Sequence, residues 1–448
     1  MTKKTRLIIL TVCAVLFFII TPYILLYSLG YRVDFETKKI VATGGLYIKA
    51  QPQGATITID SKISNKTSMF FNSVFVQNLL PKRHTLKIEK DGYYNYEKNL
   101  DVRGNEVAKL EHVVLMKKNI SFELLKDAVD YFSFSPDENS LLTAGIKPNT
   151  INIYVSDISG RQSKAYTVNV KNGSIQDTQW SDDGKTILLH IGTDYYRLNA
   201  NASAVINVPI LASVTEAQIN PQNNQEIFFI KNKNLYSNLQ TLPLLKNVAA
   251  YQLINQDIIW LSYDGFLYDY ATSSKTQNKI TSQVFAVKQN SSYTVTTLSG
   301  NIFVKEHNAF FKLNQGSKIL ESFYNPVEDI KVSPDGQKVV YCNDHEVLLS
   351  FLNSDDKSRI FLNRFSGTIG GCHWLNNEYL IFTLGDKIII SEIDNRGNIN
   401  TNDLSQQISL ADGKSITIKN PKIFLRQQDK KVYILSERTL LFSERLIP

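Results

Sequence analysis

Residues 331–341 read KVSPDGQKVVY, which is a strand, a tight turn and a second strand, and related stretches recur along the chain. Proline presets φ at the second position of such a turn, aspartate bonds the backbone, and glycine tolerates the exit geometry. The apolar runs on both sides of the turn predict antiparallel strands that need neighbouring units to bury their faces. The sequence therefore predicts a repeated β-hairpin as the unit of the fold.

Eight such units follow one another between residue 119 and residue 448. Similar turns lie at 132–143, 179–189 and 218–229, and degenerate versions start near Ile254, Ala286, His373 and Leu425. A third strand follows each unit, and spacings of about 33 to 52 residues suit four-stranded blades. We predict an all-β fold with a β-propeller over 119–448, of eight blades, or seven if the weak 284–320 unit merges with a neighbour.

The ends of the repeat region predict how the ring closes. The last unit ends at Pro448 after only three strands, while Ile120–Lys126 forms a strand ahead of the first full unit. An unpaired edge strand exposes backbone donors and acceptors. We therefore expect Ile120–Lys126 to complete the last blade.

The N-terminal segment predicts a membrane anchor. Residues 7–29 carry no charge and are long enough, as a helix, to cross the hydrocarbon core of a bilayer. Lys3, Lys4 and Arg6 precede them, so the positive-inside rule predicts a cytoplasmic tail at 1–6 and an extracytoplasmic remainder. A cleaved signal peptide and a lipoprotein signal at Cys13 are the alternatives. Both fit poorly, because no small-x-small site ends the apolar run and the run continues well past Cys13.

A small β-sandwich is predicted between this helix and the repeats. Residues 30–45 are expected to be a short extended linker, and residues 46–118 alternate apolar and polar side chains with period two. Strands are expected at 46–50, 55–59, 85–89, 98–102 and 109–116.

Several residues of 46–118 resemble the PEGA domain family. The turn Pro52-Gln53-Gly54-Ala55 precedes an alternating strand and Asp60, and Asp91-Gly92-Tyr93 follows later. The chain departs from the family pattern at Gln53, at 65–68 and at 81–84. The resemblance implies an interaction or spacer module of a surface protein rather than a catalyst. The turn units with Trp180 are similar to TolB-type and WD-like propeller repeats, whose fold serves many functions.

Local signatures of catalysis or metal binding are missing from the sequence. The six histidines form no His-x-His or i, i+4 pair, and there is no Cys-x-x-Cys, Gly-x-Ser-x-Gly elbow or P-loop. Asp394–Asp403 spaces oxygens as a calcium loop does, but Arg396 takes a ligand position and no glutamate stands at position twelve, so we interpret it as a polar loop, with a weak calcium site as the alternative.

Four aspartates raise the question of a paired-carboxylate hydrolase. They are Asp137, Asp182, Asp183 and Asp335, and all lie in the turn motifs, so we interpret them as turn residues. His190, His345 and His373 lie in or near strands and are expected to pack. No catalytic, cofactor-binding or metal-binding residue is predicted, and no cofactor.

The distribution of charge along the chain limits the class of partner. The net charge is +4 for residues 1–45, +5 for 46–118 and −2 for 119–448. The large domain therefore lacks the basic character of a nucleic-acid binder, and we predict no nucleic-acid partner. The basic excess of the sandwich fits an anionic lipid or wall polymer, with Lys82, Arg83, Lys87 and Lys90 contributing.

For Cys342 and Cys372, in consecutive units, a disulfide and two free buried thiols both stay open.

These observations favour a membrane-anchored extracytoplasmic binding or scaffold protein of the cell envelope, without enzymatic activity. Residues 7–29 would contact lipid, and the propeller would present its loops to a protein or cell-wall glycan. An extracytoplasmic hydrolase with its active site in the propeller funnel is the alternative. A sensor is less favoured, because a cytoplasmic part of about six residues is too short for an output domain.

Overall fold

The computed structural model of the protein describes residues 2–67, 72–160, 163–200, 202, 204–214, 216–352, 359–405, 409–410 and 416–448. The chain divides into two compact units. The first comprises Met1–Asn119, Ser391–Asn402 and Leu446–Pro448, and the second comprises Ile120–Ile390 and Asp403–Arg445.

The first unit begins with the helix α1 (Lys3–Ser28), which continues through Pro22 as one element. Thr2 caps its first turn, accepting a hydrogen bond from the Thr5 amide, and no helix residue is buried by the protein. The helix is long and apolar enough to cross a membrane, by length and composition.

Residues 30–45, expected to be an extended linker, instead form a hairpin. β1 (Tyr31–Asp34) pairs antiparallel with β2 (Lys39–Ala42), in the register Tyr31↔Ala42. The Asp34 carboxylate accepts hydrogen bonds from the Glu36 amide and the Thr37 hydroxyl, which stabilises the turn. The extended-linker prediction was wrong because it overlooked this aspartate-initiated turn between two short alternating stretches.

A two-sheet sandwich follows in the first unit. Its strands are β3 (Gly44–Gln51), β4 (Thr56–Ile59), β5 (Ile63–Lys66), β6 (Ser73–Leu79), β7 (Arg83–Glu89), β8 (Tyr96–Asp101) and β9 (Val107–Val114). One sheet has the order β6-β3-β9 and the other β5-β4-β7-β8. Alternate residues such as Leu46, Ile57 and Leu86 point into one shared core, as the period-two pattern predicts. Strands β5 and β6 were not predicted, and Ser68, in the second departure from the PEGA pattern, lies outside the described residues.

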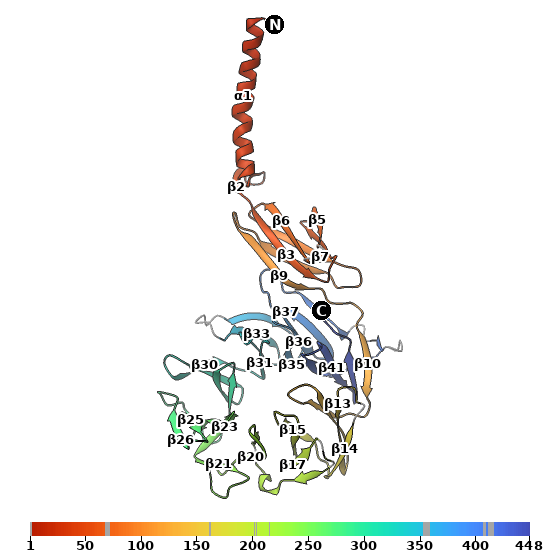
Figure 1. Cartoon of the computed structure of the whole chain (residues 1–448), viewed down its shortest axis with the longest axis vertical. Helices are drawn as coiled ribbons and strands as arrows, with labels where there is room; N and C mark the ends of the chain where they lie inside the picture. The colour runs from red at the N-terminus through yellow and green to blue at the C-terminus, as the bar shows by residue number, and fades with distance from the viewer. Residues whose placement is uncertain are drawn as a thin grey trace. The chain divides into compact units, whose positions relative to one another are not determined.

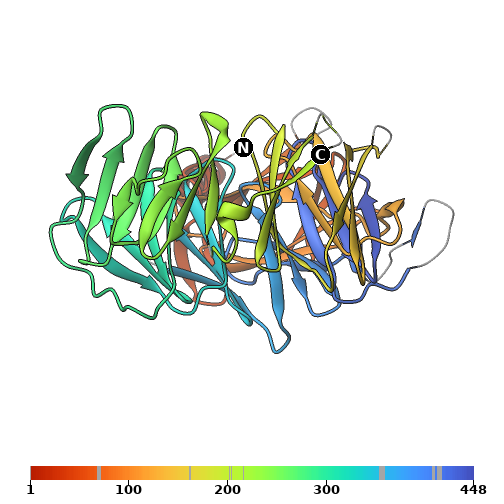
Figure 2. The ribbon, with the colours of Figure 1, turned by 90° about the horizontal axis from the view of Figure 1, so that it is seen from below.

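The second unit is a β-propeller, and eight blades are present in the part of the chain that the structure describes. Figure 1 shows them as a ring, with β15, β23, β31 and β35 near its centre and β14, β26 and β30 at its rim; Figure 2 shows the sheets side by side in a flat disc. Both the propeller and the blade number of eight are confirmed.

The first four blades have the strand orders β11-β12-β13-β14, β15-β16-β17-β18, β19-β20-β21-β22 and β23-β24-β25-β26. Their bounds are β11 (Tyr131–Phe134), β12 (Ser140–Lys147), β13 (Thr150–Asp157), β14 (Lys164–Asn169), β15 (Ile175–Trp180), β16 (Thr186–Ile191), β17 (Asp194–Asn199), β18 (Val205–Asn207), β19 (Ala217–Asn220), β20 (Asn223–Lys231), β21 (Asn234–Ser237), β22 (Leu245–Lys246), β23 (Val248–Ile254), β24 (Asp257–Ser262), β25 (Leu267–Ala271) and β26 (Thr276–Lys279), with the short 3-10 helix Pro209–Leu211 between β18 and β19.

The next three blades are β27-β28-β29-β30, β31-β32-β33-β34 and β35-β36-β37-β38, and the last is β10-β42-β41-β40, with β39 beside β10. Their bounds are β27 (Tyr293–Leu298), β28 (Asn301–Glu306), β29 (Ala309–Asn314), β30 (Ile319–Tyr324), β31 (Asp329–Val332), β32 (Lys338–Cys342), β33 (Glu346–Phe351), β34 (Arg359–Arg364), β35 (Ile369–Trp374), β36 (Tyr379–Leu384), β37 (Lys387–Glu392), β38 (Thr401–Asp403), β39 (Ser409–Leu410), β40 (Lys422–Arg426), β41 (Lys431–Ser436), β42 (Thr439–Ser443) and β10 (Ser121–Lys126).

The ring closes as the sequence predicts. β10 pairs antiparallel with β42, in the register Phe122↔Ser443 and Glu123↔Phe442, and so supplies the outer strand of the last blade. The amide of Glu444 donates to the Ser121 carbonyl at 2.8 Å, which extends the pairing by one step. Phe122 is fully buried. The N-terminal strand of the propeller thus holds its C-terminal blade.

The repeated turns share one hydrogen-bond unit. In three of them a buried serine hydroxyl donates to the aspartate two residues later, at 2.5–2.7 Å, and accepts from the amide five residues later, at 2.9 Å. The serines are Ser135, Ser181 and Ser333, and the aspartates are Asp137, Asp183 and Asp335. The serine hydrogen bond lowers the pKa of Asp137 and of Asp183. This geometry confirms that these three aspartates are turn residues.

Ring closure gives a stability prediction. Truncating the buried ring in Phe122→Ala should destabilise the propeller by about 3–5 kcal/mol, because it removes packing at the closing strand. Leu124→Ala on the same strand is the matched control, since Leu124 is 49% exposed and should cost little. All three tryptophans lie in the propeller, so the fluorescence-detected unfolding temperature of the purified full chain reports the effect. Equal unfolding temperatures for the two variants would argue against a closing role for β10.

Candidate functional site

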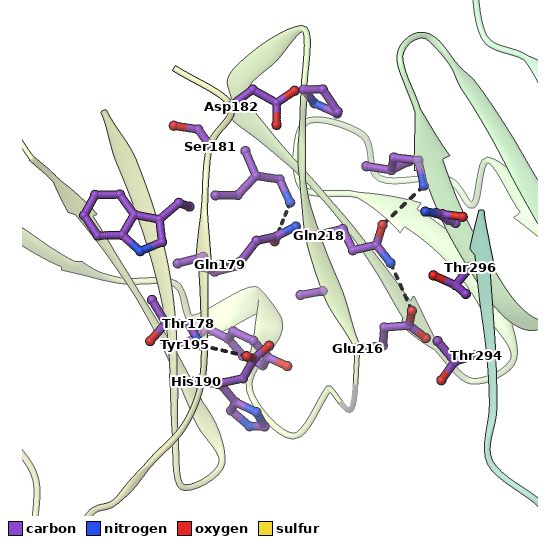
Figure 3. A pocket seen from close by; sticks show the side chains of 18 of the residues that line it. Thr178, Gln179, Ser181, Asp182, His190, Tyr195, Glu216, Gln218, Thr294 and Thr296 are labelled. Atoms are coloured by element: carbon purple, nitrogen blue, oxygen red, sulfur yellow. Dashed lines mark hydrogen bonds between the residues drawn. The ribbon is translucent and has the colours of Figure 1, made fainter. Parts of the chain in front are cut away.

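A cavity of about 550 Å³ lies among the inner strands of four consecutive blades. Its walls come from β15, β19, β23 and β27, the first strand of each blade, and Figure 3 shows the labelled side chains that line it. β15 contacts β19, and β23 contacts β27, so these strands stand next to one another around the centre of the ring. The site therefore occupies the central channel of the propeller.

Glu216 is the most perturbed acid of this cavity. It lies directly before β19 and lines the cavity wall. Its Oε1 accepts a hydrogen bond from Gln218 Nε2 at 3.0 Å. Burial raises the pKa of the Glu216 carboxyl from its ordinary value of 4.5 to about 7, and the Gln218 hydrogen bond opposes this shift. The carboxyl is thus held near the midpoint of its titration at neutral pH.

Two glutamines fix the cavity wall around this acid. Gln218 Nε2 also donates to the Tyr251 carbonyl at 3.3 Å, and its Oε1 accepts from the Leu253 amide at 3.3 Å, which ties β19 to β23. Gln179 Oε1 accepts from the Ile219 amide at 2.9 Å, which ties β15 to β19. Figure 3 shows the bonds of Gln218 to Leu253 and of Gln179 to Ile219 as dashed lines. Side-chain amides therefore bridge the inner strands where no sheet ladder joins them.

The aromatic pair of His190 and Tyr195 and a second acid, Asp177, also line the cavity. His190 and Tyr195 stack with ring centroids 4.3 Å apart and lie opposite each other on β16 and β17. Burial raises the pKa of Tyr195 to about 12, with smaller contributions from the charges of Asp177 and Glu216. Both acids therefore act electrostatically on the Tyr195 hydroxyl.

Two residues that we interpreted from the sequence as turn or packing residues line this cavity. Asp182 lines it, although we interpreted this residue as belonging only to a turn, while its neighbour Asp183 bonds Ser181 in that turn. His190 also lines it, in addition to packing on Tyr195. His373 behaves as a packing residue, since burial lowers its pKa to about 4.

The segment considered as a weak calcium site is bonded to protein cations. Within the first unit, Arg396 binds the Asp394 carboxylate through Nε and Nη2, at 3.0 and 2.7 Å. Lys98, fully buried, donates to Glu392 at 2.7 Å and to the Asp394 carbonyl at 2.6 Å. In the described part of the chain no group of three His, Cys, Asp or Glu residues is arranged to hold a metal ion. The polar-loop interpretation fits this bonding.

The two propeller cysteines are buried free thiols. A hydrogen bond to Cys342 and burial raise the pKa of the Cys372 thiol. They lie on β32 and β35 of adjacent blades and contribute to packing there.

The four basic residues that we expected to contact an anionic surface each have a partner in the protein. Salt bridges join Lys82 to Glu36 at 2.9 Å, Arg83 to Asp101 at 3.2 Å and Lys87 to Glu89 at 2.8 Å, and Lys90 donates to the Gln53 carbonyl. Partly exposed pairs of this kind contribute little to stability.

Similarity to known proteins supports the two folds. Residues 43–119 match the PEGA domain model. No curated protein sequence is significantly similar to the chain.

Solved structures resemble the propeller. The C-terminal WD40 domain of Sif2 aligns with a TM-score of 0.50 at 12% identity, covering 74% of this chain and 99% of that one. The computationally designed Ika8 protein aligns with a TM-score of 0.47 at 12% identity, covering 73% of this chain and 98% of that one. The extracellular domain of the hybrid two-component system BT4673 from B. thetaiotaomicron aligns with a TM-score of 0.43 at 11% identity, covering 72% of this chain and 39% of that one. At these identities the Sif2 match shows the fold alone.

The raised pKa of Glu216 gives a pH-dependent stability prediction. Between about pH 5 and pH 8 the unfolded carboxyl ionises freely while the folded one resists ionisation, so wild-type stability should fall with rising pH by up to about 3 kcal/mol from this group. Glu216→Gln should therefore gain stability relative to wild type as pH rises, seen as a growing difference in unfolding temperature. Glu123→Gln, an exposed carboxylate of β10, is the control and should show no such trend. A Glu216→Gln difference that does not change with pH would contradict the assignment.

Proposed function

We propose that this protein is a membrane-anchored, extracytoplasmic binding protein of the cell envelope that receives a protein or glycan partner in the central channel of its propeller. The observation that carries the proposal is the channel cavity, which is walled by four blades and contains a perturbed acid. Concave sites of 300–1,000 Å³ with a few convergent polar groups are typical of ligand binding. Perturbed titratable groups cluster at functional sites.

The anchor in this proposal is α1. Three basic residues flank its N-terminal side, which favours a cytoplasmic N-terminus and an extracytoplasmic sandwich and propeller. The PEGA domain at 43–119 supports the same placement. In this proposal the sandwich follows the anchor along the chain, and the propeller supplies the binding site.

A hydrolase is the second candidate, because a pKa of about 7 suits a general acid. Asp177 and Asp182, in the same cavity, would have to supply a nucleophile or a base. However, burial causes the shift of Glu216, and no neighbouring carboxylate contributes to it. This differs from the coupled pairs of carboxylate hydrolases, and binding is the better-supported role.

Photo-crosslinking in intact cells tests the proposal. A photoreactive phenylalanine analogue at Thr294, an exposed position of the cavity wall, should crosslink to an extracytoplasmic protein or glycan. The same analogue at Gln277, exposed on the outer strand β26, is the matched control and should give little crosslinking. Equal products from both positions, or products confined to cytoplasmic proteins, would contradict the proposal.

A further inference from the structure

The channel cavity is lined by acidic side chains that no lysine or arginine of the lining balances. Asp177, Asp182 and Glu216 line it, and its lining residues include no lysine or arginine. Two donors of the lining are engaged within the protein: Gln218 Nε2 bonds Glu216 and the Tyr251 carbonyl, and Trp180 Nε1 donates to Ser133 at 3.1 Å. The charge of the lining therefore favours a cationic ligand.

One buried acceptor of the lining lacks a donor among the described residues, and Glu216 receives a single hydrogen bond. The Glu216 carboxyl is largely enclosed by protein, yet only its Oε1 receives a hydrogen bond, from Gln218. Gln252 Oε1 is fully buried and accepts none. Buried polar atoms are nearly always hydrogen-bonded in folded proteins, and an unpaired buried carboxylate is costly. Gln252 lies on β23 and Glu216 directly precedes β19, which points to one ligand between these two neighbouring blades.

The size of the cavity selects the class of that ligand. A bare metal ion needs several oxygens within about 2.0–2.6 Å, and the described residues contain no such cluster. A volume of about 550 Å³ instead suits an organic group. Planar guanidinium and ammonium groups supply several donors together with a positive charge.

We propose that the channel cavity binds an organic cation, a guanidinium or protonated amine, held by Glu216, Gln252 and Asp177. The cation comes either from a basic side chain of a protein partner or from a free amine. This proposal rests on the binding role of the channel proposed above and specifies its ligand.

Protons compete with the cation at this site. Glu216 is half-protonated near pH 7, and only its ionised form attracts a cation, so affinity falls as pH decreases. The other titratable groups that face it are Asp177 from β15, His190 from β16, Tyr195 from β17 and Tyr251 from β23. Because several titratable groups face the cavity, the Glu216→Gln variant is needed to assign the pH dependence to Glu216.

Calorimetry on the full chain in lipid nanodiscs tests the proposal. The probes are acetyl-Gly-Arg-Gly-amide, its neutral isostere with citrulline in place of arginine, and 1,5-diaminopentane as a free amine. We expect saturable binding of a cationic probe and at least about tenfold weaker binding of the citrulline peptide. Tighter binding of the arginine peptide would identify a protein side chain as the source, and tighter binding of the diamine would identify a free amine. Equal binding of the arginine and citrulline peptides, or no binding of either cation, would overturn the proposal.

Two variants test whether Glu216 holds the cation, and calcium chloride tests whether an inorganic ion competes for the site. Glu216→Gln should weaken cation binding at least about tenfold and reduce its dependence on pH between about 6 and 8, while the control Glu123→Gln should bind as wild type does. Unfolding temperatures verify that both variants fold. Displacement of the probe by millimolar calcium chloride would indicate an inorganic ion and contradict the proposal.

Failure of this inference is distinguishable from failure of the proposed function. Crosslinking at Thr294 without cation binding would leave the channel a binding site but refute its ligand class. Cation binding without a crosslinked partner would refute the partner-binding role and leave the cation site in place.

Discussion

The pairing of β10 with β42 is the constraint on which the propeller depends. More than three hundred residues separate Phe122 from its partner Ser443, and every other blade lies between them. Without this pairing the last blade would expose an open edge, and adjacent blades would be free to separate. Closure fixes the distances between inner strands, so that residues from four blades can face one cavity.

The cavity departs from the repeat that builds the ring. The regular units stabilise themselves through the serine–aspartate turn, whose groups are satisfied locally. In the third blade the serine–aspartate hydrogen bond is lost, since Asn220 replaces the serine and Gln222 the aspartate, and Glu216 and Gln218 precede this turn. Gln218 instead bonds neighbouring strands, and Glu216 keeps an acid in a costly environment. Positions where local consistency fails are often functional, because a stable fold can tolerate a few of them.

The sequence predicts features that depend on residues close together in the chain or on the order of its repeats, and it does not predict side-chain contacts between distant segments. The turns and the alternating strands are local, so the sandwich, the eight blades and the closing strand were predictable from the order of residues. The hairpin Tyr31–Ala42 was missed because its strands are short and its turn depends on Asp34. The cavity could not be predicted, since Asp177, Glu216 and Gln252 lie in different blades and meet only in the closed ring. No local signal marked Glu216, since Asp177 and Asp329 stand at the equivalent point of two other units, four residues before the turn.

Direct titration of the Glu216 carboxyl tests the central claim, that the closed ring encloses an acid in its channel. Carbon-13 NMR of glutamate-labelled full chain, with the Glu216→Gln variant to assign the resonance, reports this pKa without any ligand. The account predicts a value of about 7, because the surrounding inner strands keep water from the carboxyl. A value near the ordinary 4.5 would mean that the channel leaves this group in solvent, and it would contradict both the enclosed cavity and its proposed ligand.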